Sequence, residues 1–201
     1  MPRVAGQIDR AKSGAILDAA AAVLCERGLS APLDEIARRA GVSKQTIYNH
    51  YGSKAELMRA LFQRRVGRVI APLEGPDAEA FPEAALAAYA RAILSALASE
   101  QSVAMIRLVV SSVPTAPELT RAAYEASIRP TRAGLAAFLE RETRLGRLAV
   151  ADAALAADFF TGMVLGHTQM RLLFGVPAPL DEDHIEAIAR EAARRFVRAY
   201  G

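Results

Sequence analysis

The fold is decided by residues 33–54, LDEIARRAGVSKQTIYNHYGSK. The apolar residues of its first half recur at the spacing of an amphipathic helix, at Leu33, Ile36, Ala37 and Ala40. Gly41 can end that helix, because a residue without a Cβ adopts the left-handed cap conformation at little cost. Ser43 can then cap a second helix over Lys44–Tyr51 by accepting a bond from a free backbone N–H. Two short helices joined in this way predict a helix-turn-helix.

The second helix of this pair has an unusually polar surface. Ile47 and Tyr51 are expected to face inward. The outward positions are Lys44, Gln45, Thr46, Tyr48, Asn49 and His50. Nearly all of these side chains can hydrogen-bond to a phosphate or to a base edge. The segment therefore predicts a DNA-reading surface.

The same region resembles the TetR (tetracycline-repressor-like) family of transcriptional regulators. The similarity runs from Ile16 through Leu57 and includes ILDAAAAVLCERG and LDEIARRAGVS. The family's pattern of Tyr, any residue, His, aromatic, any residue, small residue and Lys is present as Tyr48, His50, Tyr51, Ser53 and Lys54. The resemblance implies an all-α fold with an N-terminal three-helix DNA-binding domain and a C-terminal helical bundle that binds an effector and dimerises.

The chain departs from the family just before the motif. The family usually has Thr followed by Ser or Thr where this sequence has Ala31 and Pro32. Pro32 suits the first turn of a helix, where its missing N–H is no loss. No phosphate contact is expected at these two positions, and Ser30 is left to supply the helix cap.

Roles on the second helix follow from side-chain chemistry. Gln45 can pair with adenine through two hydrogen bonds, and the Thr46 methyl group can contact a thymine methyl group. Lys44 can reach a guanine or a phosphate, and Asn49 can serve either purpose. The resemblance assigns phosphate contacts, which fix register without reading sequence, to Tyr48, His50 and Lys54.

Composition and charge agree with this interpretation. The chain has 201 residues, of which 52% are hydrophobic and 6% aromatic, and it has no Trp. Such an Ala- and Leu-rich composition favours helices. Residues 1–70 carry 12 Lys and Arg against 6 Asp and Glu, whereas the rest carries 13 against 16. A basic N-terminal part on a mildly acidic remainder is typical of a DNA-binding domain beside a non-binding one, although random scatter of surface charge gives differences of this size.

Further along, the segment APLEGPDAEAFPE (71–83) contains three prolines and a glycine and indicates a domain boundary. We therefore expect a DNA-binding domain over 1–70 and an effector-binding and dimerisation domain over 71–201. The latter is expected to contain helices at about 83–100, 103–112, 116–129, 131–145, 152–174 and 181–199. The single Cys25 excludes an internal disulfide and fits a cytoplasmic location. No apolar run approaches the roughly 20 residues of a membrane span, so no membrane partner is expected.

The resemblance implies an apolar effector pocket and a dimer interface in the C-terminal domain. Pocket candidates are Tyr89, Met105, Tyr124, Phe138, Phe160, Met163, His167 and Gln169. Interface candidates are Leu155, Phe159, Gly162, Gly166, Met170, Ile188 and Phe196. The two glycines permit close helix packing between subunits or make space for a neighbouring side chain. His167 can donate to a ligand, bind a nearby carbonyl or lie at the dimer seam.

These observations predict a sequence-specific DNA-binding regulator and not an enzyme. The sequence shows no nucleophile with a base, no paired carboxylates and no cluster with metal-ligand spacing, so no catalytic residue, cofactor or metal is expected. An architectural DNA binder without an effector should have a more uniformly basic second half. We expect a homodimer on a palindromic double-stranded operator, acting as a repressor that a small apolar or amphipathic effector releases. Activation in place of repression stays open.

Overall fold

The computed structural model describes residues 5–29, 31–75 and 81–201, with side chains from residue 12 onward. Within these ranges all regular structure is helical, in helices α1 to α11, which confirms the predicted all-α class. Ser30, the expected cap of the second helix, lies outside the described residues.

The chain folds into two compact units. The head unit comprises the residues up to Arg64 together with Ala104–Ala126, and the body unit comprises Arg65–Val103 and Ser127–Gly201. Helix α4 (Lys54–Glu74) therefore contributes to both units. The boundaries of these compact units differ from the expected boundary at residue 70. The expected boundary separates a DNA-binding domain from an effector-binding domain, and that functional division stays a prediction.

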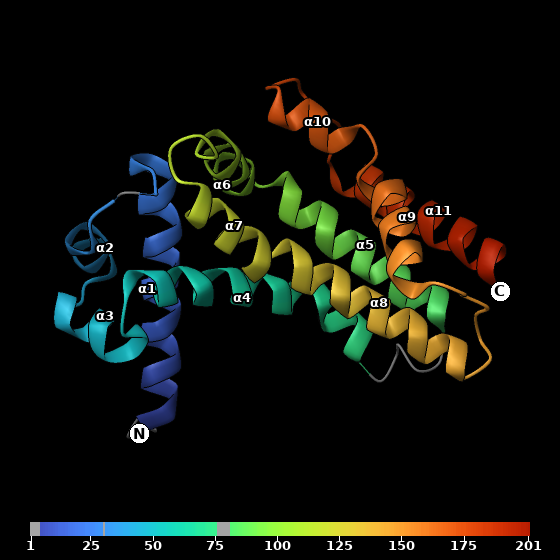
Figure 1. Cartoon of the computed structure of the whole chain (residues 1–201), viewed down its shortest axis with the longest axis horizontal. Helices are drawn as coiled ribbons and strands as arrows, with labels where there is room; N and C mark the ends of the chain where they lie inside the picture. Colours follow the sequence, from blue (N-terminus) through green and yellow to red (C-terminus); the bar gives the residue numbers. More distant parts are fainter. Residues whose placement is uncertain (1–4, 30, 76–80) are drawn as a thin grey trace. The chain divides into compact units, whose positions relative to one another are not determined.

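The head unit is built around α1 (Ala5–Arg27), which carries a row of buried side chains. This row comprises Ile16, Ala20, Val23 and Leu24. Against it pack α2 (Leu33–Ala40), α3 (Lys44–Tyr51) and the first part of α4 (Figure 1). Helices α6 (Glu100–Ser111) and α7 (Pro117–Ala126) complete the same core with Met105 and Ala123.

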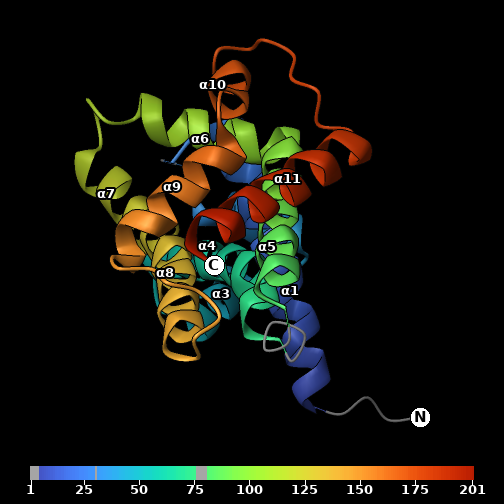
Figure 2. The same ribbon diagram turned by 90° about the vertical axis from the view of Figure 1, so that its right-hand side faces the viewer.

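The body unit is a helical bundle. Helix α11 (Glu182–Tyr200) packs along α5 (Pro82–Ala98) and against α9 (Ala153–Leu165), and α9 packs against α8 (Ile128–Arg144) (Figure 2). A chain of aromatic rings joins α5, α9 and α11. Tyr89 lies 6.2 Å from Phe160, Phe160 lies 5.2 Å from Phe196, and Phe196 lies 4.6 Å from Tyr200, measured between ring centroids. Such ring pairs add to the stability that burial of their area provides.

The single helix expected over 152–174 is wrong. Helix α9 begins after Asp152, whose carboxylate accepts from the backbone N–H of Leu155, and it ends at Leu165. Gly166 follows with a φ of 45°, a conformation that a glycine adopts without strain. A separate short helix, α10 (Thr168–Leu173), comes after it. Gly166 is therefore a helix stop, because its positive φ interrupts the helical backbone.

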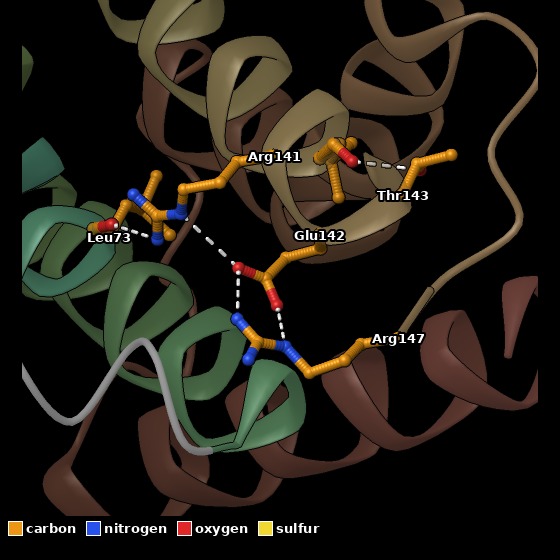
Figure 3. Close-up of polar contacts among 6 residues, drawn as sticks. Leu73, Arg141, Glu142, Thr143 and Arg147 are labelled. Atoms are coloured by element: carbon orange, nitrogen blue, oxygen red, sulfur yellow. Dashed lines mark hydrogen bonds and ion pairs between the residues drawn. The ribbon is translucent and has the colours of Figure 1, made fainter. Parts of the chain in front are cut away.

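One carboxylate, that of Glu142, is fully buried near the end of α8. It accepts hydrogen bonds from Arg147 Nε at 2.6 Å and Nη2 at 3.0 Å, and it accepts a longer one from Arg141 Nε at 3.3 Å. Arg141 also donates to the backbone carbonyl of Leu73 in the last turn of α4, as Figure 3 shows. A buried charge is tolerated only when it is paired and hydrogen-bonded. This cluster therefore ties α8 and the loop after it to the end of α4.

Helices α8 and α4 also approach closely about two turns earlier on α8 and one turn earlier on α4. A Cβ added to Gly134 would lie 3.0 Å from Cγ2 of Ile70, so glycine at this position allows the two backbones to come together.

As for membrane crossing, no single helix among the described residues is long and apolar enough for it. Helices α5 and α6 reach that length and hydropathy only when they are taken together across the break between them.

Candidate nucleic-acid interface

The turn between α2 and α3 has the predicted geometry. Gly41 has a φ of 66°, and its backbone N–H bonds to the carbonyls of the last turn of α2. The N–H of Val42 then donates to the carbonyl of Ala37 at 3.0 Å. Ser43 caps α3 by accepting from the backbone N–H of Thr46 at 3.0 Å. Both the glycine stop and the serine cap are confirmed.

Helix α3 has one inward face and a wide polar outward face. Ile47 is 1% exposed and packs in the head core. Tyr51 is half-buried, with its hydroxyl 3.4 Å from the carbonyl oxygen of Ser13 on α1. Thr46 is also half-buried, and Tyr48 is 41% exposed. The other predicted contact residues on this helix are exposed, namely Lys44, Gln45, Asn49 and His50.

The polar side chains of α3 bond to one another and to α2. Lys44 Nζ lies 2.9 Å from Oδ2 of Asp34 on α2, and this hydrogen bond and charge raise the pKa of Lys44. Gln45 Nε2 donates to Oδ1 of Asn49 at 2.8 Å. With this bond made, Gln45 still has one N–H and its carbonyl oxygen, which are the groups that complement adenine. Exposed ion pairs are weak, so Lys44 can readily exchange Asp34 for another anionic partner.

Lys54 is held differently from the other predicted phosphate contacts. Its Nζ donates to the backbone carbonyls of Leu29 at 2.7 Å and Ala31 at 2.5 Å. Partial burial lowers the pKa of this ammonium group. The first residue of α4 is thereby joined to the connection between α1 and α2.

The eight effector candidates are divided between the two units. Tyr89, Phe138 and Phe160 are buried in the body core, whereas Met105 is buried in the head core. Tyr124 also belongs to the head unit and is exposed. Met163 lies on α9, and His167 and Gln169 lie at the start of α10. Met163 and His167 are exposed, whereas Gln169 is half-buried.

An open depression of about 480 Å³ lies beside α10. It is lined by His167, Met170, Arg171, Phe174 and Val176. Of the effector candidates only His167 contributes to it. Among the described residues no group of three His, Cys, Asp or Glu side chains is placed to hold a metal ion.

The interface candidates divide between surface and core. Leu155, Phe159 and Met170 are 48%, 55% and 48% exposed, and Gly162 and Gly166 are exposed with them. Ile188 is half-buried against the body core, and Phe196 is fully buried in it. Phe196 therefore stabilises the packing of α11 within the bundle, and those interface candidates that are both apolar and exposed lie on α9 and α10.

Two partners in the head could not be found from the sequence. Asp34 precedes Lys44 by ten residues, a separation at which no helical spacing rule applies. The carbonyls that bind Lys54 belong to backbone, which carries no sequence signal. Only the packing of α2, α3 and α4 brings these groups together.

A helix-turn-helix with a buried inner face and an exposed polar second helix defines the class of helix-turn-helix DNA-binding proteins. Residues 16–61 match the N-terminal region of the bacterial regulatory proteins of the tetR family, and residues 84–201 match the C-terminal domain of AefR-like transcriptional repressors. The chain belongs to the TetR family of transcriptional regulators.

Known relatives agree with this assignment. The structure of a TetR-family transcriptional regulator from Mesorhizobium loti is 27% identical, with a TM-score of 0.75 over 96% of this chain and 98% of that one. The HTH-type transcriptional activator FasR of Mycolicibacterium smegmatis is 47% identical over 60 residues, and the repressor KstR2 of Mycobacterium tuberculosis is 41% identical over 64. These two matches cover only 27% and 32% of the relatives' own lengths.

Proposed function

We propose that this protein is a dimeric repressor that binds a palindromic operator through α3 and leaves it when a small apolar or amphipathic molecule binds. The observation that carries the proposal is α3 itself, in which Ile47 anchors the helix while its polar side chains stay exposed. In helix-turn-helix proteins such a helix enters the major groove with its N-terminal residues at the base edges. Lys44, Gln45 and Thr46 occupy that end of α3.

The surface of α9 supports the dimer. Its buried face includes Ala156, Phe160 and Val164, yet Leu155 and Phe159 on the other face are also apolar and largely exposed. A contiguous apolar surface of this kind marks an interaction site. In a symmetric dimer the same patch serves both subunits, which yields two copies of α3 and a palindromic site with half-sites about 34 Å apart.

Release by an effector follows from linkage. A molecule that binds more tightly to a conformation of the body unit other than the DNA-bound one lowers the affinity of the protein for DNA. DNA then lowers the affinity for that molecule by the same free energy. Helix α4 is the part of the chain placed to carry the change, because its residues belong to both units. Repression in the cytoplasm is the simplest outcome of such release.

The direct test is DNA binding by the purified protein, followed by fluorescence anisotropy on the intergenic DNA that flanks its gene. Gln45→Ala should weaken specific binding by about 1–3 kcal/mol and relax the preference at one base pair. Tyr48→Phe, which removes one hydroxyl group, should weaken binding equally on all sequences that bind. Glu140→Gln, an exposed position of the body unit, is the matched control and should bind as wild type.

Binding with the stoichiometry of a dimer and a steep loss with salt would support the proposal. A protein shown by mass spectrometry to be free of ligand, and that binds no genomic fragment, would contradict it. Transcription from the bound promoter in vitro decides the sign, since a repressor must lower it and an activator must raise it.

A further inference from the structure

The first turns of α2 and α3 are joined by an ion pair that is open to solvent. Lys44, the first residue of α3, has its Nζ 2.9 Å from Oδ2 of Asp34, the second residue of α2. The side chain of Lys44 is 46% exposed and that of Asp34 is 66% exposed. The other acidic residue in the first turn of α2, Glu35, pairs with Arg38 on its own helix. Asp34 alone of these two carboxylates therefore lies beside the N-terminal end of α3, the end that faces base edges in helix-turn-helix proteins.

A carboxylate is an unfavourable group on a surface that approaches DNA, unless the bases give it a hydrogen-bond donor. The phosphates of DNA repel a negative charge, whatever the base sequence. In the major groove, the donors that a carboxylate can accept from are the amino groups, N4 of cytosine and N6 of adenine. Where no amino group lies opposite it, the carboxylate weakens binding. A carboxylate at this place therefore selects against some sequences and adds nothing to general affinity.

The ion pair as a whole complements a keto group that lies beside an amino group. Lys44 supplies N–H donors and Asp34 supplies acceptors, and the bonded atoms of the two side chains are 2.9 Å apart. Within a base pair, the keto oxygen and the amino nitrogen that hydrogen-bond to each other are also about 2.9 Å apart. An ammonium group and a carboxylate each have bonding capacity left after one mutual bond. Both can therefore bond to one base pair while they stay bonded to each other.

We propose that Asp34 is a specificity-determining residue of the DNA interface, and that together with Lys44 it reads one base pair of each half-site. The base pair is guanine with cytosine: O6 of guanine accepts from Lys44, and N4 of cytosine donates to Asp34. N7 of guanine offers Lys44 a second acceptor, which thymine lacks. The inverted pair, cytosine with guanine, places an amino group opposite Lys44 and a keto oxygen opposite Asp34. This inference rests on the proposed function, since it concerns the same DNA interface.

The experiment measures binding by fluorescence anisotropy on the shortest intergenic duplex that binds the wild-type protein. Each base pair of one half-site is exchanged in turn, and each duplex is titrated with wild type, Asp34→Ala and Lys44→Met. Wild type should lose about 5–150-fold in affinity when one particular guanine–cytosine pair is inverted. Asp34→Ala should bind that inverted duplex more tightly than wild type does, because the repelled carboxylate is gone. Lys44→Met should lose its preference at the same base pair.

Glu26→Ala is the matched control. It also removes one carboxylate from the head unit and breaks an exposed ion pair between two helices, that of Glu26 on α1 with Arg39 on α2. This control should change the affinity for every duplex by one common factor. Asp34→Asn, which keeps the shape of the side chain, covers the case in which Asp34→Ala folds poorly. It should also relax the preference, because an amide can present N–H₂ as well as oxygen.

Three results would overturn the proposal. In the first, Asp34→Ala and Asp34→Asn keep the wild-type preference at every base pair. In the second, Asp34→Ala and Lys44→Met relax the preference at different base pairs. In the third, the Asp34 variants lose affinity equally on all duplexes, which would make Asp34 a residue of the fold alone. A wild-type protein that binds no DNA would instead contradict the proposed function, and this inference with it.

Discussion

Replacing Glu142 with Gln should destabilise the body unit measurably. The carboxylate is fully buried and accepts two close hydrogen bonds from Arg147 and one longer bond from Arg141. Gln keeps the shape but loses the charge, and its amide N–H₂ turns one acceptor into a donor facing a guanidinium. Breaking a buried ion pair costs about 3–5 kcal/mol. Both arginine side chains are about a third exposed, so water can solvate them after the substitution. We therefore expect the free energy of unfolding to fall by an amount at or below the lower limit of that range, about 2–3 kcal/mol.

The assay is urea unfolding followed by far-UV circular dichroism, at one fixed protein concentration because the unfolding of the proposed dimer would depend on concentration. A loss of 2–3 kcal/mol corresponds to a Tm lower by roughly 4–12 °C for a chain of this size. Glu140→Gln, an exposed position on the same helix, should stay within about 0.5 kcal/mol of wild type. The double variant Glu142→Gln with Arg147→Met should lose less than the sum of the single variants. If Glu142→Gln unfolds like the Glu140→Gln control, the cluster does not stabilise the fold and the reasoning is refuted.

Three further perturbations test other parts of the structure. Phe159→Asp places a charge in the exposed apolar face of α9, so sedimentation should show a weakened dimer. The control Leu145→Asp, at an exposed apolar position at the end of α8, should sediment as wild type. An intact dimer in Phe159→Asp would exclude this face of α9 as the dimer interface. Gly134→Val should destabilise by about 1–3 kcal/mol in urea, because its Cβ would lie 3.0 Å from Cγ2 of Ile70, and an unchanged midpoint would show that α4 and α8 can separate freely. Hydrogen bonds from Arg194, and to a lesser extent from Arg195, lower the pKa of Glu191 to about 2, below its ordinary value of 4.5. The contribution of Glu191 to folding stability is therefore present above about pH 4.5 and is lost as the pH falls towards 2. Tm measured across that window should fall less in Glu191→Gln than in wild type, and identical acid profiles would contradict the assignment.

Local sequence rules were sufficient for the DNA-reading motif. The glycine stop at Gly41, the serine cap at Ser43 and the inward position of Ile47 depend on φ preference, on one short hydrogen bond and on helical period. Each of these is a property of neighbouring residues, which is why a single sequence reveals it. The same rules failed for 152–174, because a largely apolar run indicates helix without showing that Gly166 takes a positive φ.

The roles of residues far apart in the sequence needed the tertiary structure. Composition and periodicity predict that Phe159 and Phe196 are both apolar helix positions, but only packing shows that Phe196 is enclosed by its own bundle while Phe159 is exposed. The sequence by itself determined that this is a helical protein with a helix-turn-helix, since both follow from contacts within a few residues. The tertiary structure alone decided that Lys54 binds distant carbonyls and that Glu142 is buried beside two arginines that are its neighbours in sequence, because both the distant partner and the burial are set by how the helices pack.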